Sequence, residues 1–231
     1  MGCWKDCKCR SISLCFRCRT IGKSTLLSLL SGLLEPEHGS ILFYGQKLNQ
    51  KSCSAIGYML QHDHLFEWRT NEKNVLLGLE IQNKLTPETK GQVLEMLKTY
   101  GLYKFKDARP SQLSGGMRQR AALIRTLALS PKLLLLDEPF SALDYQTRLT
   151  VGDDIGAIIK KEQKTAILVT HDLSEAVSLG SKVLVLSKRP ATVKAVVDIS
   201  FPDNISALER RNSPEFKDYF NKIWKELNED G

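Results

Sequence analysis

The sequence predicts an α/β fold in which a mainly parallel sheet carries helices on both faces. Three short apolar segments support this fold class: Leu133–Leu136, Ala166–Thr170 and Lys182–Leu186. Continuous apolar runs of this length are typical of strands that are buried on both faces. The segments between them are helical in pattern, and strands that alternate with helices usually form a parallel sheet.

The elements before these strands fit the same class. Lys23–Leu34 is expected to form a helix, because its leucines recur at helical spacing. Ser40–Tyr44 and Ala55–Leu60 are expected to be short strands. Residues from about 62 to 130 are expected to be mostly helical, with one helix beginning at Thr86-Pro87.

Two further helices complete the expected elements. Arg118–Leu129 begins just after the Gly115-Gly116 pair. The last helix opens at Ser213-Pro214, and we expect its apolar face to pack on its own chain. That face consists of Phe216, Tyr219, Phe220, Ile223, Trp224 and Leu227.

Charge and hydropathy narrow the class of protein. No apolar run approaches the roughly 20 residues of a membrane span, so we expect any membrane association to come through a partner. The net charge is +7, but the first 20 residues hold five basic residues and one acidic residue, which leaves only +3 for the other 211. So mild a surface charge disfavours nucleic acid as a partner.

The first 20 residues differ from the rest of the chain. Five of the six cysteines lie there, and no alternating strand pattern is visible. Cys15 and Cys18 have the spacing of a zinc-binding pair, but no second regular pair and no histidine accompany them. We therefore expect residues 1–20 to be an aberrant or disordered segment. Our hypothesis is a shifted reading frame, a late start or an error in the gene model.

Gly22-Lys23-Ser24-Thr25 matches the downstream half of a phosphate-binding P-loop. A helix that starts here presents free N–H groups and the positive end of its dipole to phosphate. Lys23 is expected to reach the β- and γ-phosphates, Ser24 to bind Mg²⁺ through its hydroxyl, and Thr25 to lie near the α-phosphate. The upstream half departs from the motif, because Arg17 and Thr20 stand where glycine usually allows a tight turn.

Five further motifs follow in a fixed order. They are Gln61, Leu113-Ser114-Gly115-Gly116-Met117-Arg118-Gln119-Arg120, Lys132-Leu133-Leu134-Leu135-Leu136-Asp137-Glu138-Pro139, Ser141-Ala142-Leu143-Asp144 and Val169-Thr170-His171-Asp172. Together with the P-loop half, they resemble the Q-loop, signature, Walker B, D-loop and switch-histidine motifs of the ABC ATPase family. The resemblance covers about residues 21–231.

The resemblance implies a fold and a set of roles. The fold would be a P-loop NTPase core with an inserted helical signature lobe at about 62–130 and incomplete N-terminal antiparallel strands. ATP and Mg²⁺ would be bound, with Ser24, Gln61 and Asp137 serving the metal. Glu138 would polarise the attacking water as general base, and His171 and Gln61 would complete the catalytic set.

The resemblance also implies partners. Two copies of the chain would pair head to tail, so that Lys23 and Asp137 of one copy face Ser114, Gly115 and Gly116 of the other. An integral membrane permease, and indirectly a solute-binding protein, would place the homodimer at the cytoplasmic face of the membrane. Segments such as Leu65–Thr70 and the last helix resemble the nitrate, sulfonate and taurine importers, some of whose relatives carry a thiamine-precursor pyrimidine.

Two other interpretations remain open from the sequence. One is an ABC ATPase outside transport, although the coiled-coil insert or second ATPase domain usual in such chains is absent. The other is a catalytically impaired or dead subunit. Arg17 and Thr20 favour it, and Glu138 and His171 speak against it. Family members also have about forty residues before the P-loop lysine, among them an adenine-stacking aromatic residue that Trp4 or Phe16 replaces poorly.

Overall fold

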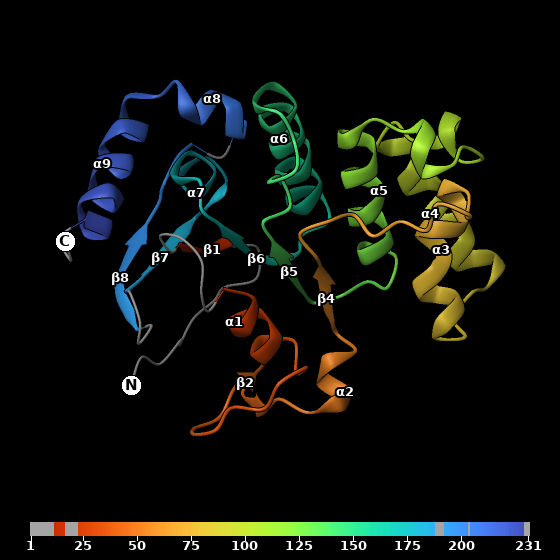
Figure 1. Cartoon of the computed structure of the whole chain (residues 1–231), viewed down its shortest axis with the longest axis horizontal. Coiled ribbons are helices and arrows are strands. Elements are labelled where there is room, and N and C mark those ends of the chain that lie inside the picture. Colours follow the sequence, from red (N-terminus) through yellow and green to blue (C-terminus); the bar gives the residue numbers. More distant parts are fainter. Residues whose placement is uncertain (1–11, 17–22, 188–191, 203, 229–231) are drawn as a thin grey trace.

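The computed structural model confirms the α/β class with a mainly parallel sheet (Figure 1). It describes residues 12–16, 23–187, 192–202 and 204–228, without the side chains of 12–16 and of Lys51. The main sheet has the strand order β4-β5-β6-β1-β7-β8, in which only β8 is antiparallel to its neighbour. The strands are β4 (Ile56–Met59), β5 (Leu133–Asp137), β6 (Thr165–Thr170), β1 (Ile12–Phe16), β7 (Lys182–Leu186) and β8 (Val193–Asp198).

Alternate residues of the central strands face two different layers of helices, as a doubly covered sheet requires. Leu134 and Leu136 of β5 pack in the large core with α6 (Tyr145–Lys161), α7 (Leu173–Leu179) and α9 (Pro214–Asn228). Leu135 lies in a smaller core on the opposite face. There it packs with Leu27 of α1 (Lys23–Leu30) and Val169 of β6. The short helix α8 (Ala207–Arg211) packs beside α6 and α7.

Three helices form a separate lobe beside the sheet. They are α3 (Asn71–Ile81), α4 (Pro87–Thr99) and α5 (Gly115–Leu127), with the 3₁₀ turns η1 (Tyr103–Phe105) and η2 (Pro110–Gln112) between α4 and α5. They share a core of their own, whose members include Leu65, Val75, Leu79, Leu97 and Ile124. Helix α5 also packs on α6 and on the edge strand β4, and these contacts join the lobe to the sheet.

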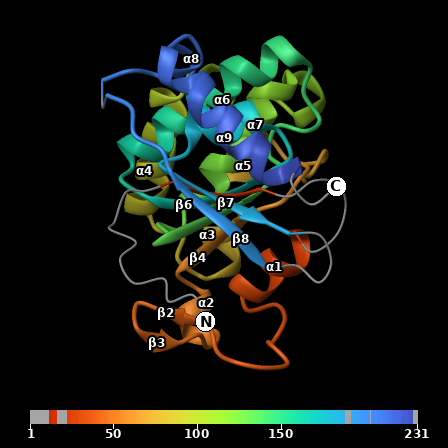
Figure 2. The ribbon, with the colours of Figure 1, turned by 90° about the vertical axis from the view of Figure 1, so that its left-hand side faces the viewer.

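A small subdomain lies below the sheet, on the α1 side (Figure 2). It holds the two-stranded sheet of β2 (Leu42–Phe43) and β3 (Gln46–Lys47) and the short helix α2 (Gln50–Cys53). Within the described ranges, no helix is long and apolar enough to cross a membrane.

Several predicted elements need correction. Residues 1–20 do contain a strand, because β1 lies between β6 and β7 in the middle of the sheet. The first helix ends at Leu30 and not at Leu34, because Gly32 adopts a left-handed conformation with φ of 75°. Leu33 and Leu34 are consequently exposed. The antiparallel edge strand β8 was not predicted, because its residues do not form a continuous apolar run.

Candidate functional site

The site forms where three elements meet at the carboxyl edge of the sheet. Helix α1 begins at Lys23, β5 ends at Asp137, and β6 ends one residue before His171. Carboxyl ends of parallel strands share one edge, which is where α/β proteins commonly bind ligands. Lys23 forms an ion pair with Glu138, and Ser24 Oγ donates a hydrogen bond to Asp137 Oδ2 at 3.2 Å.

Glu138 occupies the centre of this group. Its carboxylate lies between Lys23 Nζ and His171 Nδ1, and the distance from Glu138 Oε2 to His171 Nδ1 is 2.9 Å. The backbone φ of Glu138 is 43°, which is uncommon for a residue other than glycine and is frequent at functional sites. The Glu138 amide donates to the Val169 carbonyl at 2.8 Å, which fixes this turn against β6.

The two adjacent carboxyl groups have pKa values shifted in opposite directions. Burial raises the pKa of Asp137 above its usual value, although hydrogen bonds from Ser24 and Tyr58 oppose the shift. Burial acts in the same direction on Glu138, but the hydrogen bond and charge of Lys23, with His171, outweigh it and lower the pKa of Glu138. Glu138 is therefore held as a carboxylate, the form that can accept a proton.

Tyr58 belongs to the site, although the sequence analysis did not name it. Its hydroxyl donates to Asp137 Oδ2 at 3.3 Å, and burial together with the Asp137 charge raises its pKa to about 12. Tyr58 pairs with Leu135 in the register of β4 and β5, so its ring lies beside the strand that ends in Asp137. A polar aromatic residue in an otherwise apolar strand, three residues before Gln61, was the available signal.

Gln61 joins the group indirectly. Its Nε2 donates to Ser141 Oγ at 3.2 Å, and Ser141 Oγ donates to the Glu138 carbonyl at 3.0 Å. Within the described part of the chain, no hydrogen bond connects Gln61 to Ser24 or Asp137. Ser141 therefore connects the loop after β4 with the loop after β5.

The signature residues lie on the helical lobe and serve their own helix pair. Ser114 caps α5 by accepting a hydrogen bond from the Met117 amide at 3.3 Å. A Cβ added to Gly115 would lie 2.9 Å from Leu143, and one added to Gly116 would lie 2.6 Å from Val151 of α6. Among the described contacts, none links Ser114 to Lys23, Asp137 or Glu138.

The donor set fits a nucleotide with a divalent cation. The Ser24 hydroxyl and the Asp137 carboxylate are hard oxygen ligands, which Mg²⁺ prefers, and they already lie within hydrogen-bond distance of each other. Lys23 stands at the first turn of α1, where the helix dipole also favours phosphate. Thr25 is exposed on the same turn. Gly22, Cys18 and the side chain of Cys15 lie outside the part of the chain that the structure describes.

Comparison with known proteins gives a consistent result. Residues 20–141 match the family model described as ABC transporter. An uncharacterized ABC transporter ATP-binding protein of Bacillus subtilis, YtlC, is 49% identical over 90% of this chain and 80% of its own length. The nitrate import ATP-binding protein NrtD of Synechocystis is 39% identical over 87% of this chain and 77% of its own length.

Two further matches add to this result. The taurine import ATP-binding protein TauB of Rhizobium johnstonii is 38% identical over 87% of this chain and 78% of its own length. Among solved structures, the dimeric ATP-binding cassette MJ0796, bound to ADP and Pi in a post-hydrolysis state, is similar with a TM-score of 0.69 and 27% identity. The match covers 86% of this chain and 89% of that one.

Proposed function

The chain belongs to the ABC transporter family and is an ATPase, and we propose that it powers the uptake of a small solute through a separate permease. The observation that carries this proposal is the Glu138 carboxylate, held between Lys23 and His171 at the carboxyl edge of the sheet. The solute class is nitrate, sulfonate, taurine or a pyrimidine of similar size, supported by the relatives named for nitrate and taurine import.

The proposed chemistry is hydrolysis of the γ-phosphate of ATP. Lys23 leaves Glu138 to contact the phosphates, and Glu138 then accepts a proton from the attacking water. A bond forms between the water oxygen and the γ-phosphorus, and the bond to the bridging oxygen of ADP breaks. His171 orients the same phosphate. Ser24 and Asp137, with Gln61, would hold Mg²⁺, which would supply positive charge to neutralise the phosphates.

The signature residues are proposed to act on the nucleotide of a second copy. Ser114, Gly115 and Gly116 lie apart from Lys23 in the described contacts, so one chain supplies only part of the site. A head-to-tail homodimer brings the two parts together, and the dimeric state of the similar cassette supports this arrangement. We place the dimer on a permease at the cytoplasmic face of the membrane, with a solute-binding protein as an indirect partner and no nucleic acid.

The first experiment measures ATP hydrolysis and self-association by the purified chain. Wild type should hydrolyse ATP, and Glu138→Gln should bind ATP without hydrolysing it and elute as a dimer when ATP is present. Lys23→Ala is the matched control, since it should lose binding and remain monomeric. Hydrolysis by Glu138→Gln at the wild-type rate would overturn the assignment of Glu138.

The second experiment tests transport. The chain is expressed together with the proposed permease and solute-binding protein. Uptake of labelled nitrate, taurine, an alkyl sulfonate and a pyrimidine is then compared with that of the Glu138→Gln strain. Uptake of one solute that depends on Glu138 supports the proposal. Equal uptake in both strains for every solute, the pyrimidine included, contradicts it.

A further inference from the structure

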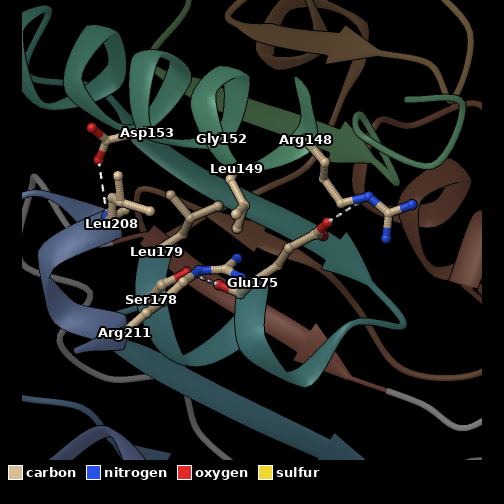
Figure 3. Close-up of a pocket in the computed structure, with 10 residues that line it drawn as sticks. Arg148, Leu149, Gly152, Asp153, Glu175, Ser178, Leu179, Leu208 and Arg211 are labelled. Carbon is tan, nitrogen blue, oxygen red and sulfur yellow. Dashed lines mark hydrogen bonds and ion pairs between the residues drawn. The ribbon is translucent and has the colours of Figure 1, made fainter. Parts of the chain in front are cut away.

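An arginine on α6 and a buried glutamate on α7 connect two loops of the site, the loop after Glu138 and the turn that carries His171. Arg148 lies in the first turn of α6, and Glu175 lies in the first turn of α7. The Glu175 side chain is only 6% exposed, and Figure 3 shows it directed from α7 toward Arg148. The two residues border a small pocket between α6, α7 and α8, and neither contacts Lys23 or Glu138 in the described contacts.

Arg148 contacts both loops at once. Its Nη2 donates to the Leu143 carbonyl at 3.2 Å, in the loop that follows Glu138. Its Nη1 lies 3.5 Å from Asp172 Oδ2, and its Nε lies 3.9 Å from Glu175 Oε1. A planar guanidinium with several donors can hold three acceptors in one fixed geometry, which a lysine cannot do.

Glu175 fixes the other side of the histidine turn. The Thr170 hydroxyl donates to Glu175 Oε2, and the Asp172 amide donates to Thr170 Oγ1 at 3.0 Å. Thr170 and Asp172 are the two chain neighbours of His171. The ring of His171 thus projects toward Glu138 from a turn that is held on both sides by the Arg148 and Glu175 contacts.

We propose that Arg148 and Glu175 are positioning residues that couple the 141–144 loop to the turn carrying His171. This inference rests on the proposed function, because it assigns these contacts to the reaction of Glu138 and His171. The Arg148 Nε is buried without a hydrogen bond, and its distance to Glu175 exceeds hydrogen-bond length. An approach of α6 and α7 by about 1 Å would therefore form this hydrogen bond and add a direct link between Arg148 and the residue that holds Thr170.

The test uses Arg148→Lys and Glu175→Gln, which keep the size and polarity of each side chain. Glu175→Gln can still accept the Thr170 hydrogen bond but loses its charge toward Arg148. Thr170→Val removes the hydroxyl that donates to Glu175 from the end of β6. It replaces either helix variant in the test if that variant does not fold. The matched control is Asp154→Asn. Asp154 lies in α6 like Arg148, but its ion pair of 3.1 Å is with Arg120 of α5 and involves neither loop.

Two measurements are made on each variant of the full chain. The first is the NMR signal of the His171 ring without nucleotide, assigned with His171→Gln. The chemical shift of this signal should change in the Arg148, Glu175 and Thr170 variants and stay at the wild-type value in Asp154→Asn. The second is steady-state ATP hydrolysis, in which kcat should fall about tenfold while KM for ATP stays within about twofold, because misplacement of a reacting group affects the transition state.

The outcomes separate this inference from the proposed function. If wild type does not hydrolyse ATP, the proposed function fails, and the His171 signal still reports whether Arg148 and Glu175 position the turn. If the His171 signal or kcat is as unaffected as in Asp154→Asn, the positioning role is wrong. A parallel loss of kcat and of ATP affinity would also overturn it, because such a loss indicates a general disturbance of the fold.

Discussion

The sheet edge and the signature turn differ in how completely one chain assembles them. At the sheet edge, Lys23, Ser24, Asp137, Glu138 and His171 meet through side-chain contacts from three elements. At the signature turn, Ser114 caps its own helix, and the glycines allow α5 to pack on α6. The first region has the groups for chemistry within one chain, and the second has groups suited to contact something outside it.

Under the proposed function, the signature motif serves packing within the chain and nucleotide contact with the same atoms. Within the chain, a side chain at Gly116 would clash with the β-branched Val151, and one at Gly115 would displace the end of the Leu143 side chain. Under the proposed function, the same absence of side chains would let a phosphate held by a second copy approach the N–H groups at the start of α5. A substitution at these glycines would affect both roles, so the comparison needs variants that disturb only one region.

The largest effect is expected from Glu138→Gln, which breaks the sheet-edge region alone. The rate of ATP hydrolysis should fall about 10³-fold, because a general base contributes roughly 10²–10⁴-fold. ATP affinity should stay near the wild-type value, since Lys23 remains. Radiolabelled phosphate release and nucleotide-binding titration measure the two quantities, and a rate within about tenfold of wild type contradicts the assignment.

The next largest effect is expected from Ser114→Arg, which breaks the signature region without filling the space at the glycines. Hydrolysis should fall about 10²-fold through loss of an oriented contact, while nucleotide binding to the separate chain is unchanged. A mixture of Ser114→Arg with Glu138→Gln distinguishes the two regions. In the mixed dimer, one composite site carries both substitutions and the other neither, so activity should exceed that of either variant alone.

A smaller effect is expected from pH on the stability of the protein, through the buried Glu175 next to the turn that carries His171. Burial raises the pKa of Glu175 from 4.5 to about 7, and Arg148, Asp172 and His171 are the charged or titratable groups that act on it; Asp153 and Arg211 border the same pocket. A carboxyl group with a raised folded-state pKa binds its proton more tightly when folded, so its destabilising effect grows as pH rises through the range from 4.5 to 7.

Glu175→Gln removes this titration. The free energy of unfolding of the variant minus that of wild type should be about 2 kcal/mol larger near pH 8 than near pH 5, because only the wild type is destabilised as pH rises. Urea unfolding of both proteins at a series of pH values measures the difference, and Asp154→Asn supplies a control that should show no such trend. A difference that does not change with pH would contradict the raised pKa.

The smallest effect is expected at the start of the P-loop. Arg17 and Thr20 stand at positions where the motif usually has glycine, and they lie outside the described residues. Replacing both by glycine should raise ATP affinity about tenfold, since non-glycine residues strain a turn of this kind. Fluorescent-nucleotide titration measures it. Affinity equal to that of wild type would contradict the prediction, and sequencing of the upstream DNA tests the reading-frame hypothesis for residues 1–20.

The sequence predicted the parts of the fold that depend on local pattern. The strands at Leu133–Leu136 and Lys182–Leu186 follow from unbroken apolar runs that need burial on both faces. The strand β1 could not be predicted in this way, because its position is set by pairing with β6 and β7. The end of the first helix was missed because the leucine spacing continues past Gly32, where the backbone turns.

The sequence by itself determined which chemical groups this chain carries, because residue type and spacing fix a lysine and a serine at a helix start and two carboxyl groups at a strand end. Only the tertiary structure decided which of them touch. It placed Tyr58 on Asp137, brought Arg148 and Glu175 behind His171, and left Ser114 apart from Lys23. The reason is physical, since contacts between distant segments depend on strand order and helix packing, which local pattern does not contain.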